Sequence, residues 1–207
     1  MNAESTTQPT HRPLRPKLGE PLAQILRDHP VIEVEIGTGK GLFLQAAAKQ
    51  SPQTYFVGVE IAQKYAAMAQ KKMESQQLSN VHVFCGDGVS VISDEIPENR
   101  LHAVHVYFPD PWWKARHKKR RVLNERMLIG IERALTPGGF LHFWTDVIDY
   151  YQSTLELIQQ VTRLQGPLFV DEPPALHDLD YRTHFERRTR LNGLPVYRSQ
   201  FQKLARS

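Results

Sequence analysis

The sequence of 207 residues has a single cysteine, Cys85, and no long apolar run. One cysteine excludes an intrachain disulfide and favours a reducing compartment, and we expect Cys85 to be a buried strand residue. A membrane span needs roughly 20 consecutive apolar residues, so we expect no membrane contact. The segment MNAESTTQPTHRPLRPK at the start lacks the apolar core of a signal peptide. These absences together predict a cytoplasmic protein.

A large net charge is also lacking, because the formal value is only +4. The positive charge is instead concentrated in one place. Between Lys114 and Arg121, six residues are Lys or Arg and none is acidic. A local excess of cations is what binding to a polyanion requires. Taken alone, however, such a run is more often a solvated surface, so the charge leaves both interpretations open.

The composition, with 23% charged and 41% hydrophobic residues, is typical of a globular domain. We predict a flexible basic N-terminal arm over residues 1–18 and one domain over residues 19–207. Strand-like and helix-like segments alternate, which predicts a mostly parallel twisted sheet with helices on both faces. The predicted strands are residues 31–36, 54–60, 80–85, 101–108, 140–145 and about 196–203, and the predicted helices are residues 20–28, 41–50, 62–77, 121–135 and about 150–164.

A glycine-rich turn, EIGTGKG, follows the first predicted strand and precedes a helix. Gly37 and Gly39 allow a tight turn and a close approach of the backbone to a ligand. Glu60 ends the next strand about 20 residues later, which is where a carboxylate binds a ribose diol. Both NAD and S-adenosylmethionine carry such a ribose, so this spacing fits either cofactor.

Two residues favour S-adenosylmethionine over NAD. Leu42 stands where the dinucleotide motif requires a small residue. Glu35 directly precedes the first glycine, and a carboxylate there suits the cationic amino-acid end of a sulfonium cofactor better than a pyrophosphate. Asp87, just past the third strand, is placed to receive the adenine amino group.

The segment FPDPWWKARHKKRR places a carboxylate, two indole rings and the dense positive charge end to end. Asp110 follows the fourth strand, at the edge where open parallel sheets bind ligands, between two prolines that restrict the backbone. Alone, Asp-Pro is an ordinary turn and Trp112 and Trp113 are ordinary packing residues. Together they fit a nucleic-acid site, with cations for phosphates, rings beside a base and a carboxylate for a base edge.

With these motifs the sequence resembles the bacterial tRNA (guanine-N7-)-methyltransferases over about residues 30 to 203. The resemblance is carried by EIGTGKG, by FPDPWWKARHKKRR, by Thr145–Asp146 after the fifth strand and by THFE at Thr183–Glu186. Trp113 stands where Pro or His is common in the family. His184 stands where Lys is common, which removes one cation near the substrate.

The resemblance implies a Rossmann-like class I S-adenosylmethionine-dependent methyltransferase fold. It also implies methyl transfer to N7 of guanosine 46 in the variable loop of tRNA, which leaves S-adenosylhomocysteine. Asp110 would be the catalytic residue and would also lie near the cofactor, with Glu35, Gly37, Gly39, Glu60 and Asp87 as cofactor-binding residues. The substrate would be held by Lys114, Asp146, Thr183 and Glu186, and the RNA contacts would be Arg116, His117, Lys118, Lys119, Arg120 and Arg121.

Several of these assignments have structural alternatives. Thr183 and Glu186 have the spacing of a capping box, and Asp146 is a candidate N-cap of the helix after the fifth strand. For the whole chain, the alternatives are a non-catalytic RNA-binding protein on a Rossmann-like fold and an NAD-dependent oxidoreductase. We expect no metal, because no histidine pairs with cysteines at ligand spacing, and no obligatory protein partner.

Overall fold

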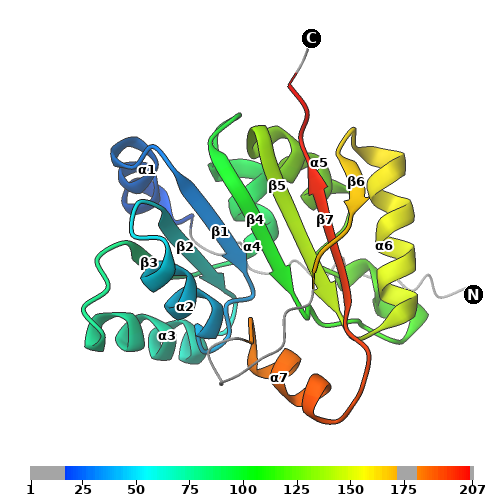
Figure 1. Cartoon of the computed structure of the whole chain (residues 1–207). Helices are drawn as coiled ribbons and strands as arrows, with labels where there is room; N and C mark the ends of the chain where they lie inside the picture. Colours follow the sequence, from blue (N-terminus) through cyan, green and yellow to red (C-terminus); the bar gives the residue numbers. More distant parts are fainter. Residues whose placement is uncertain (1–16, 172–180, 206–207) are drawn as a thin grey trace, which may run out of the picture.

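The computed structural model describes residues 17–171 and 181–205, and seven of its strands form one sheet (Figure 1). The strands are β1 (Ile32–Ile36), β2 (Tyr55–Glu60), β3 (Val81–Cys85), β4 (Leu101–Tyr107), β5 (Leu135–Thr145), β6 (Gln165–Leu168) and β7 (Tyr197–Gln202). Their spatial order is β3-β2-β1-β4-β5-β7-β6. Strands β1 to β5 pair in parallel, and β7 runs antiparallel to both β5 and β6. The predicted, mostly parallel sheet is confirmed.

The helices lie on both faces of this sheet, as the alternating pattern predicted. They are α1 (Gly19–Asp28), α2 (Leu42–Gln50), α3 (Gln63–Ser75), α4 (Gly88–Ser90), α5 (Glu125–Ala134), α6 (Ile148–Val161) and α7 (His184–Leu191), with a π-helical turn η1 (Val91–Glu95) and a 3-10 helix η2 (Ala115–Arg120).

Two boundaries differ from the prediction for local reasons. Helix α5 begins at Glu125 rather than at residue 121, because the side chain of Asn124 accepts a hydrogen bond of 3.0 Å from the N–H of Met127 and caps the helix there. Strand β5 starts at Leu135, five residues before the predicted start, and its pairing with β4 is irregular between Leu101 and Ala103. The Thr-Pro-Gly-Gly segment over residues 136–139 is therefore part of this strand.

Strand β1 sends alternate side chains to opposite faces of the sheet, as a period of two requires. Ile32, Val34 and Ile36 are buried in the larger apolar core, which α1, α5 and α6 cover. Glu33 and Glu35 point to the other face, where α2 and α3 pack over a smaller core. The acidic residues of β1 are thus directed to the face where the candidate site lies.

Three features differ from, or add to, what the composition indicated. Cys85 is exposed at the end of β3, so its predicted burial is wrong. The predicted N-terminal arm lies outside the described residues except for residues 17 and 18, of which Leu18 packs against the larger core. In the described part of the chain, no helix is both long and apolar enough to cross a membrane.

Candidate cofactor and substrate site

The glycine turn after β1 has a left-handed backbone conformation and leaves free space beside its glycines. Gly37 and Gly39 have φ angles of 80° and 55°, which side-chain-bearing residues rarely adopt. A Cβ atom added to either glycine would meet nothing within 4 Å. The turn therefore has both the conformation and the free space that a close approach of a ligand needs.

Glu60 fixes this turn to the end of β2. One carboxylate oxygen accepts a hydrogen bond of 2.8 Å from the N–H of Gly39, and the other accepts one of 2.8 Å from the N–H of Ala62 before α3. Glu60 is 7% exposed. The carboxylate predicted to bind a ribose is therefore held rigidly beside the turn, with one lone pair of each oxygen still uncommitted.

Glu35 is the most unusual carboxylate of the site, because it is 2% exposed and its Oε2 atom has no hydrogen-bond partner. Burial raises the pKa of Glu35 well above its usual range. A buried carboxylate oxygen without a hydrogen-bond partner is costly in free energy. Such a group is expected where a ligand supplies the missing cation or donor.

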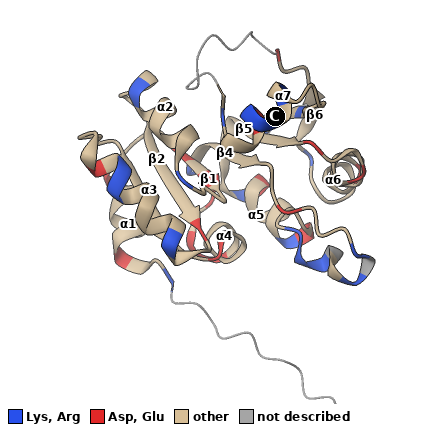
Figure 2. Cartoon of the chain, turned by 90° about the horizontal axis from the view of Figure 1, so that it is seen from below, with Lys and Arg blue, Asp and Glu red and all other residues tan. Residues whose placement is uncertain are grey.

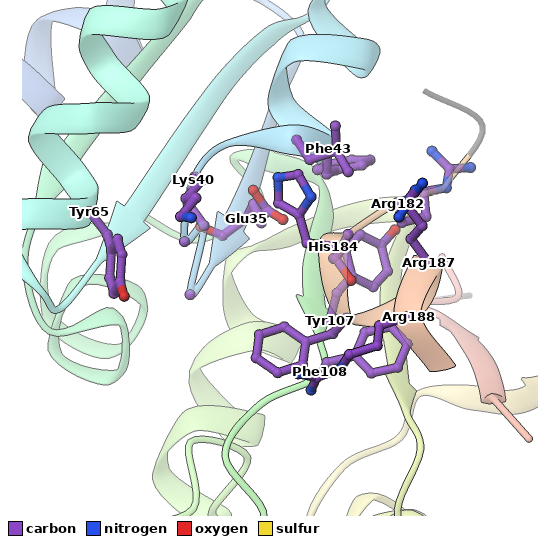
Figure 3. A pocket seen from close by; sticks show the side chains of 16 residues that line it. Glu35, Lys40, Phe43, Tyr65, Tyr107, Phe108, Arg182, His184, Arg187 and Arg188 are labelled. Carbon is purple, nitrogen blue, oxygen red and sulfur yellow. The ribbon is translucent and has the colours of Figure 1, made fainter. Parts of the chain in front are cut away.

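A cavity of about 620 Å³ opens in front of Glu35. The glycine turn and Lys40 form one wall, Phe43 of α2 and Tyr107 of β4 contribute rings, and the start of α7 closes the far side (Figure 3). The remaining lining residues are Leu42, Tyr65, Phe108, Arg182, Thr183, His184, Phe185, Arg187 and Arg188. Both apolar rings and charges of each sign thus face one space, as in sites for small polar ligands.

Tyr107 is oriented by a buried hydrogen-bond network beneath this cavity. Nε2 of His105 lies 2.8 Å from a carboxylate oxygen of Glu33, and Nδ1 lies 2.9 Å from the Tyr107 hydroxyl. Burial lowers the pKa of His105 to about 3, so the ring is neutral at pH 7. If Glu33 is ionised it has no proton to donate, and Nε2 then carries the single ring hydrogen. The Tyr107 hydroxyl must in that case donate to Nδ1, which directs its remaining lone pairs away from the network.

Asp87 lies at the same sheet edge but acts locally as a helix cap. It accepts hydrogen bonds of 3.2 Å from the N–H of Val89 and 3.4 Å from the hydroxyl of Ser90 at the start of α4. Neither Asp87 nor Asp110 forms part of the walls of the cavity. The cap holds the Asp87 carboxylate in place at this edge, and its predicted contact with adenine stays a prediction.

Asp110 lies in a strained loop directly after β4. Phe108 and Trp112 on either side have positive φ angles of 49° and 46°, which are unfavourable for bulky residues. Asp110 is exposed, and one of its carboxylate oxygens accepts a hydrogen bond of 3.2 Å from the N–H of Trp112. The expected turn is therefore present. Its strained backbone is typical of functional loops, in which the surroundings impose the conformation.

Arg121 anchors this loop and does not belong to the exposed cations. It is 9% exposed, donates hydrogen bonds of 2.9 Å to the Pro111 carbonyl and to the Ser153 hydroxyl, and stacks 4.3 Å from the ring centre of Tyr150. Its guanidinium is thus occupied between the loop and α6. The predicted RNA contact by Arg121 does not fit this position.

The other cations of the segment are directed to solvent. Lys114, Arg116, Lys119 and Arg120 are exposed and His117 is half-buried, while the side chain of Lys118 lies outside the described residues. Figure 2, seen from the edge where the parallel strands end, shows Lys and Arg gathered beside α5 and on α7. The ring of Trp112 contacts both Arg120 and His117, whereas Trp113 is 68% exposed. Trp113 is therefore the ring that remains available to a base.

The Thr183–Glu186 segment forms the capping box of α7. The Thr183 hydroxyl accepts a hydrogen bond of 3.0 Å from the N–H of Glu186, and a Glu186 oxygen accepts one of 2.6 Å from the N–H of Arg182. Glu186 is 2% exposed and also pairs with Arg190 and Arg198. Thr183 lines the cavity, but Glu186 is fully engaged and acts by holding the start of α7.

Asp146, unlike Thr183, does not cap the helix that follows it. It is exposed one residue before Val147, the N-cap of α6, and that helix has no side-chain cap. The alternative role of Asp146 as a helix cap is therefore wrong, and its predicted contact with the substrate stays a prediction. Asp146 lies outside the cavity walls.

Several cavity residues were missed by reasoning from sequence, among them Arg182 and Tyr107. Arg182 directly precedes the THFE motif and Tyr107 precedes the FPDPWW segment, so adjacency to a motif was the only available signal. Within the described residues, no group of three or more His, Cys, Asp or Glu is arranged to hold a metal ion.

Two solved structures share the fold of the chain. A 30S ribosomal A1408 methyltransferase from an uncultured bacterium aligns with a TM-score of 0.57 at 18% identity, over 88% of this chain and 92% of the other. A SAM-dependent methyltransferase from Aquifex aeolicus aligns with a TM-score of 0.51 at 15% identity, over 70% and 79%. The strand order, the glycine turn and these likenesses define a Rossmann-like class I S-adenosylmethionine-dependent methyltransferase fold.

The sequence comparisons define the family within that class. A family model described as "Putative methyltransferase" matches residues 29–199. The tRNA (guanine-N(7)-)-methyltransferase of Rhodopirellula baltica is 46% identical over 182 residues, which are 85% of this chain and 67% of the relative. The chain belongs to the tRNA (guanine-N(7)-)-methyltransferase family, as its motifs predicted.

Proposed function

We propose that the protein transfers the methyl group of S-adenosylmethionine to N7 of guanosine 46 in the variable loop of tRNA. The products are 7-methylguanosine and S-adenosylhomocysteine. The observation that carries this proposal is the arrangement at one sheet edge, where the Glu35 cavity, the strained Asp110 loop and the exposed cations follow neighbouring parallel strands. tRNA as substrate and a single cysteine also favour a cytoplasmic location.

The cofactor fits the hydrogen-bonding groups that the chain presents at this edge. The partnerless Oε2 atom of Glu35 suits an ammonium group, and the open turn at Gly37 and Gly39 suits close contact with the backbone. Glu60 is proposed to accept hydrogen bonds from the ribose hydroxyls and Asp87 one from adenine. In support, backbone N–H groups of Gly39 and Val89 hold the two carboxylates in place at this edge. When bound, S-adenosylmethionine supplies an electrophilic methyl group on its sulfonium.

Asp110 positions guanine and stabilises charge in this proposal. Guanine N7 carries a lone pair and no proton, so no residue has to act as a base to activate it. The base gains positive charge as the methyl group arrives, which a nearby carboxylate favours. Asp110 accepts hydrogen bonds from the N1 and N2 donors of guanine, which turns N7 toward the methyl group.

The exposed cations hold the RNA around this loop. Lys114, Arg116, Lys119 and Arg120 are exposed beside the strained turn, and cations so placed neutralise phosphates. Lys118 is proposed to act with them on the basis of sequence. Asp146 and Thr183 are proposed to contact the substrate from the other side of the edge.

The test uses tritiated S-adenosylmethionine with a tRNA transcript that contains G46, followed by nucleoside analysis. We expect label in 7-methylguanosine and its loss with a transcript in which A replaces G46. The Asp110→Ala variant should lose kcat on the order of 100- to 1000-fold, whereas Asp149→Asn, which changes an exposed carboxylate on α6, should retain it. Label in any other nucleoside would contradict the proposal.

A further inference from the structure

Two residues of opposite charge type line the cavity, and each has side-chain atoms without a hydrogen-bond partner among the described residues. Glu35 presents a buried oxygen without a partner. Arg182 lines the same cavity, and none of its guanidinium N–H groups donates a hydrogen bond to any described residue. Figure 3 shows the two residues approaching the cavity from opposite sides, Glu35 from β1 and Arg182 from the segment before α7.

The position of Arg182 is set by contacts that leave its hydrogen bonds unused. The guanidinium carbon lies 5.5 Å from the ring centre of Phe43 and 5.8 Å from that of Trp144. Aromatic faces attract a guanidinium but accept few of its N–H groups. The backbone N–H of Arg182 is bound by Glu186 within the capping box. Both ends of the residue are therefore oriented while its donors stay available for a ligand.

Glu35 and Arg182 are near each other without forming an ion pair. The positive charge of Arg182 lowers the pKa of Glu35 and so opposes part of the larger effect of burial. No ion pair of 4.0 Å or less joins the two among the described residues. An acidic and a basic side chain that line one cavity match a ligand with both charges, which is the case for an α-amino acid.

We infer that Arg182 binds the α-carboxylate of the methionine end of the cofactor, while Glu35 binds its α-ammonium. A guanidinium presents two parallel N–H groups, which match the two oxygens of a carboxylate. The separation of the charges across the cavity then orients the amino-acid end in one direction. This inference rests on the proposed function, because it names the group of S-adenosylmethionine that Arg182 recognises.

Calorimetric titration of the full chain with two ligands tests the inference. S-adenosylmethionine and its decarboxylated analogue differ only in the α-carboxylate. We expect the unchanged protein to bind S-adenosylmethionine more tightly than the analogue. The Arg182→Gln variant should bind S-adenosylmethionine on the order of 10- to 100-fold more weakly and should bind the analogue within about twofold of the unchanged protein.

Three further variants control for charge, for the other end of the ligand and for the shape of the guanidinium group. Arg163→Gln removes the same charge from an exposed position after α6, outside the cavity, and it should change the affinity for both ligands by less than about threefold. Glu35→Gln should weaken the binding of both ligands, because both carry the ammonium group. It should leave the affinity for 5′-methylthioadenosine unchanged. The affinity of the Arg182→Lys variant for S-adenosylmethionine should lie between those of the unchanged protein and of Arg182→Gln. Lysine keeps the positive charge but lacks the two parallel N–H groups of the guanidinium.

The outcomes separate this inference from the proposed function. If the unchanged protein binds neither ligand, the proposed cofactor is wrong and so is the inference. If it binds both ligands equally, or if Arg182→Gln weakens both by the same factor, the carboxylate contact is wrong while the cofactor stands. If the Arg182→Gln variant fails to fold, the same comparison of the two ligands is made with Arg182→Lys, which keeps the positive charge.

Discussion

The carboxylate of Glu60 accepts a hydrogen bond of 2.8 Å from the backbone N–H of Gly39, which links the end of β2 to the glycine turn after β1. The same carboxylate also receives the N–H of Ala62 at 2.8 Å. The glycine turn is thus positioned by a residue that was predicted to bind the cofactor directly. We therefore propose that one side chain serves both the folding of the site and the binding of its ligand.

The Glu60→Gln variant should weaken cofactor binding strongly. An amide can accept only one of the two backbone hydrogen bonds, and its NH₂ group then faces the other N–H. We expect the Kd of S-adenosylhomocysteine to rise on the order of 10- to 100-fold, as for the loss of a hydrogen bond to a charged group. Calorimetry measures this change, with Glu98→Gln, an exposed carboxylate, as the control. Equal affinities of the two variants would contradict the positioning role.

A pair of exposed cations should govern the salt dependence of tRNA binding. The double variant Arg116→Ala and Lys119→Ala should raise the KM for tRNA and flatten the plot of log affinity against log salt. The slope should become shallower by roughly 0.7 to 0.9 for each phosphate that the protein no longer neutralises. Arg120 is left in place because it packs against Trp112 beside Asp110.

The matched control removes two exposed cations from the opposite edge of the sheet, Lys49 in the last turn of α2 and Arg163 after α6. Their replacement by alanine should leave both the KM and the salt slope unchanged. If the two double variants shift the slope equally, the positive charge acts through the net charge of the protein and not through a contact surface.

Arg121→Ala should affect stability and turnover but not the salt slope. The variant loses hydrogen bonds of 2.9 Å to Pro111 and to Ser153 and the stacking on Tyr150. We expect a loss of about 2–4 kcal/mol in the free energy of unfolding and a lower kcat, because the Asp110 loop is released. Urea unfolding and the salt titration together check this. A flattened salt slope with unchanged stability would instead show that Arg121 contacts the RNA.

Two histidines should make the protein less stable in mild acid. Burial lowers the pKa of His105 and of His142 to about 3 from an ordinary value of 6.5. Between these values the unfolded chain binds protons that the folded protein excludes, so the free energy of unfolding falls as the pH drops below about 6.5. The slope is at most roughly 1.4 kcal/mol per pH unit for each histidine.

Urea unfolding at about pH 7, 6 and 5 measures this loss, and the His142→Phe variant isolates one histidine. Its stability should fall less steeply than that of the unchanged protein over this range. The comparison is needed because burial raises the pKa of Glu33 and of Glu35, and protonation of these groups stabilises the fold as the pH falls. Identical slopes for both proteins would show that His142 does not titrate on unfolding in this range.

Most of the fold could be predicted because it depends on short-range patterns. The first four strands lie within two residues of their predicted ends, since runs of β-branched and aromatic residues bounded by turns mark them clearly. Strand β6 was not predicted, because Gln165–Leu168 contains Gly166 and Pro167 and has no alternating pattern. It forms only because β7 offers an edge with which it can pair.

By itself, the sequence determined the order of the elements, the glycine turn and the set of charged residues that the turn and the loop after β4 bring to one edge. These features follow from local conformational preference and from the rule that parallel strands end at the same side of a sheet. Only the tertiary structure decided which of these charges stay available. Arg120 and Arg121 are neighbours, yet one is exposed and the other is buried against α6. Burial depends on which elements pack together, and for that reason the partnerless oxygen of Glu35 and the available donors of Arg182 could be recognised only in the folded protein.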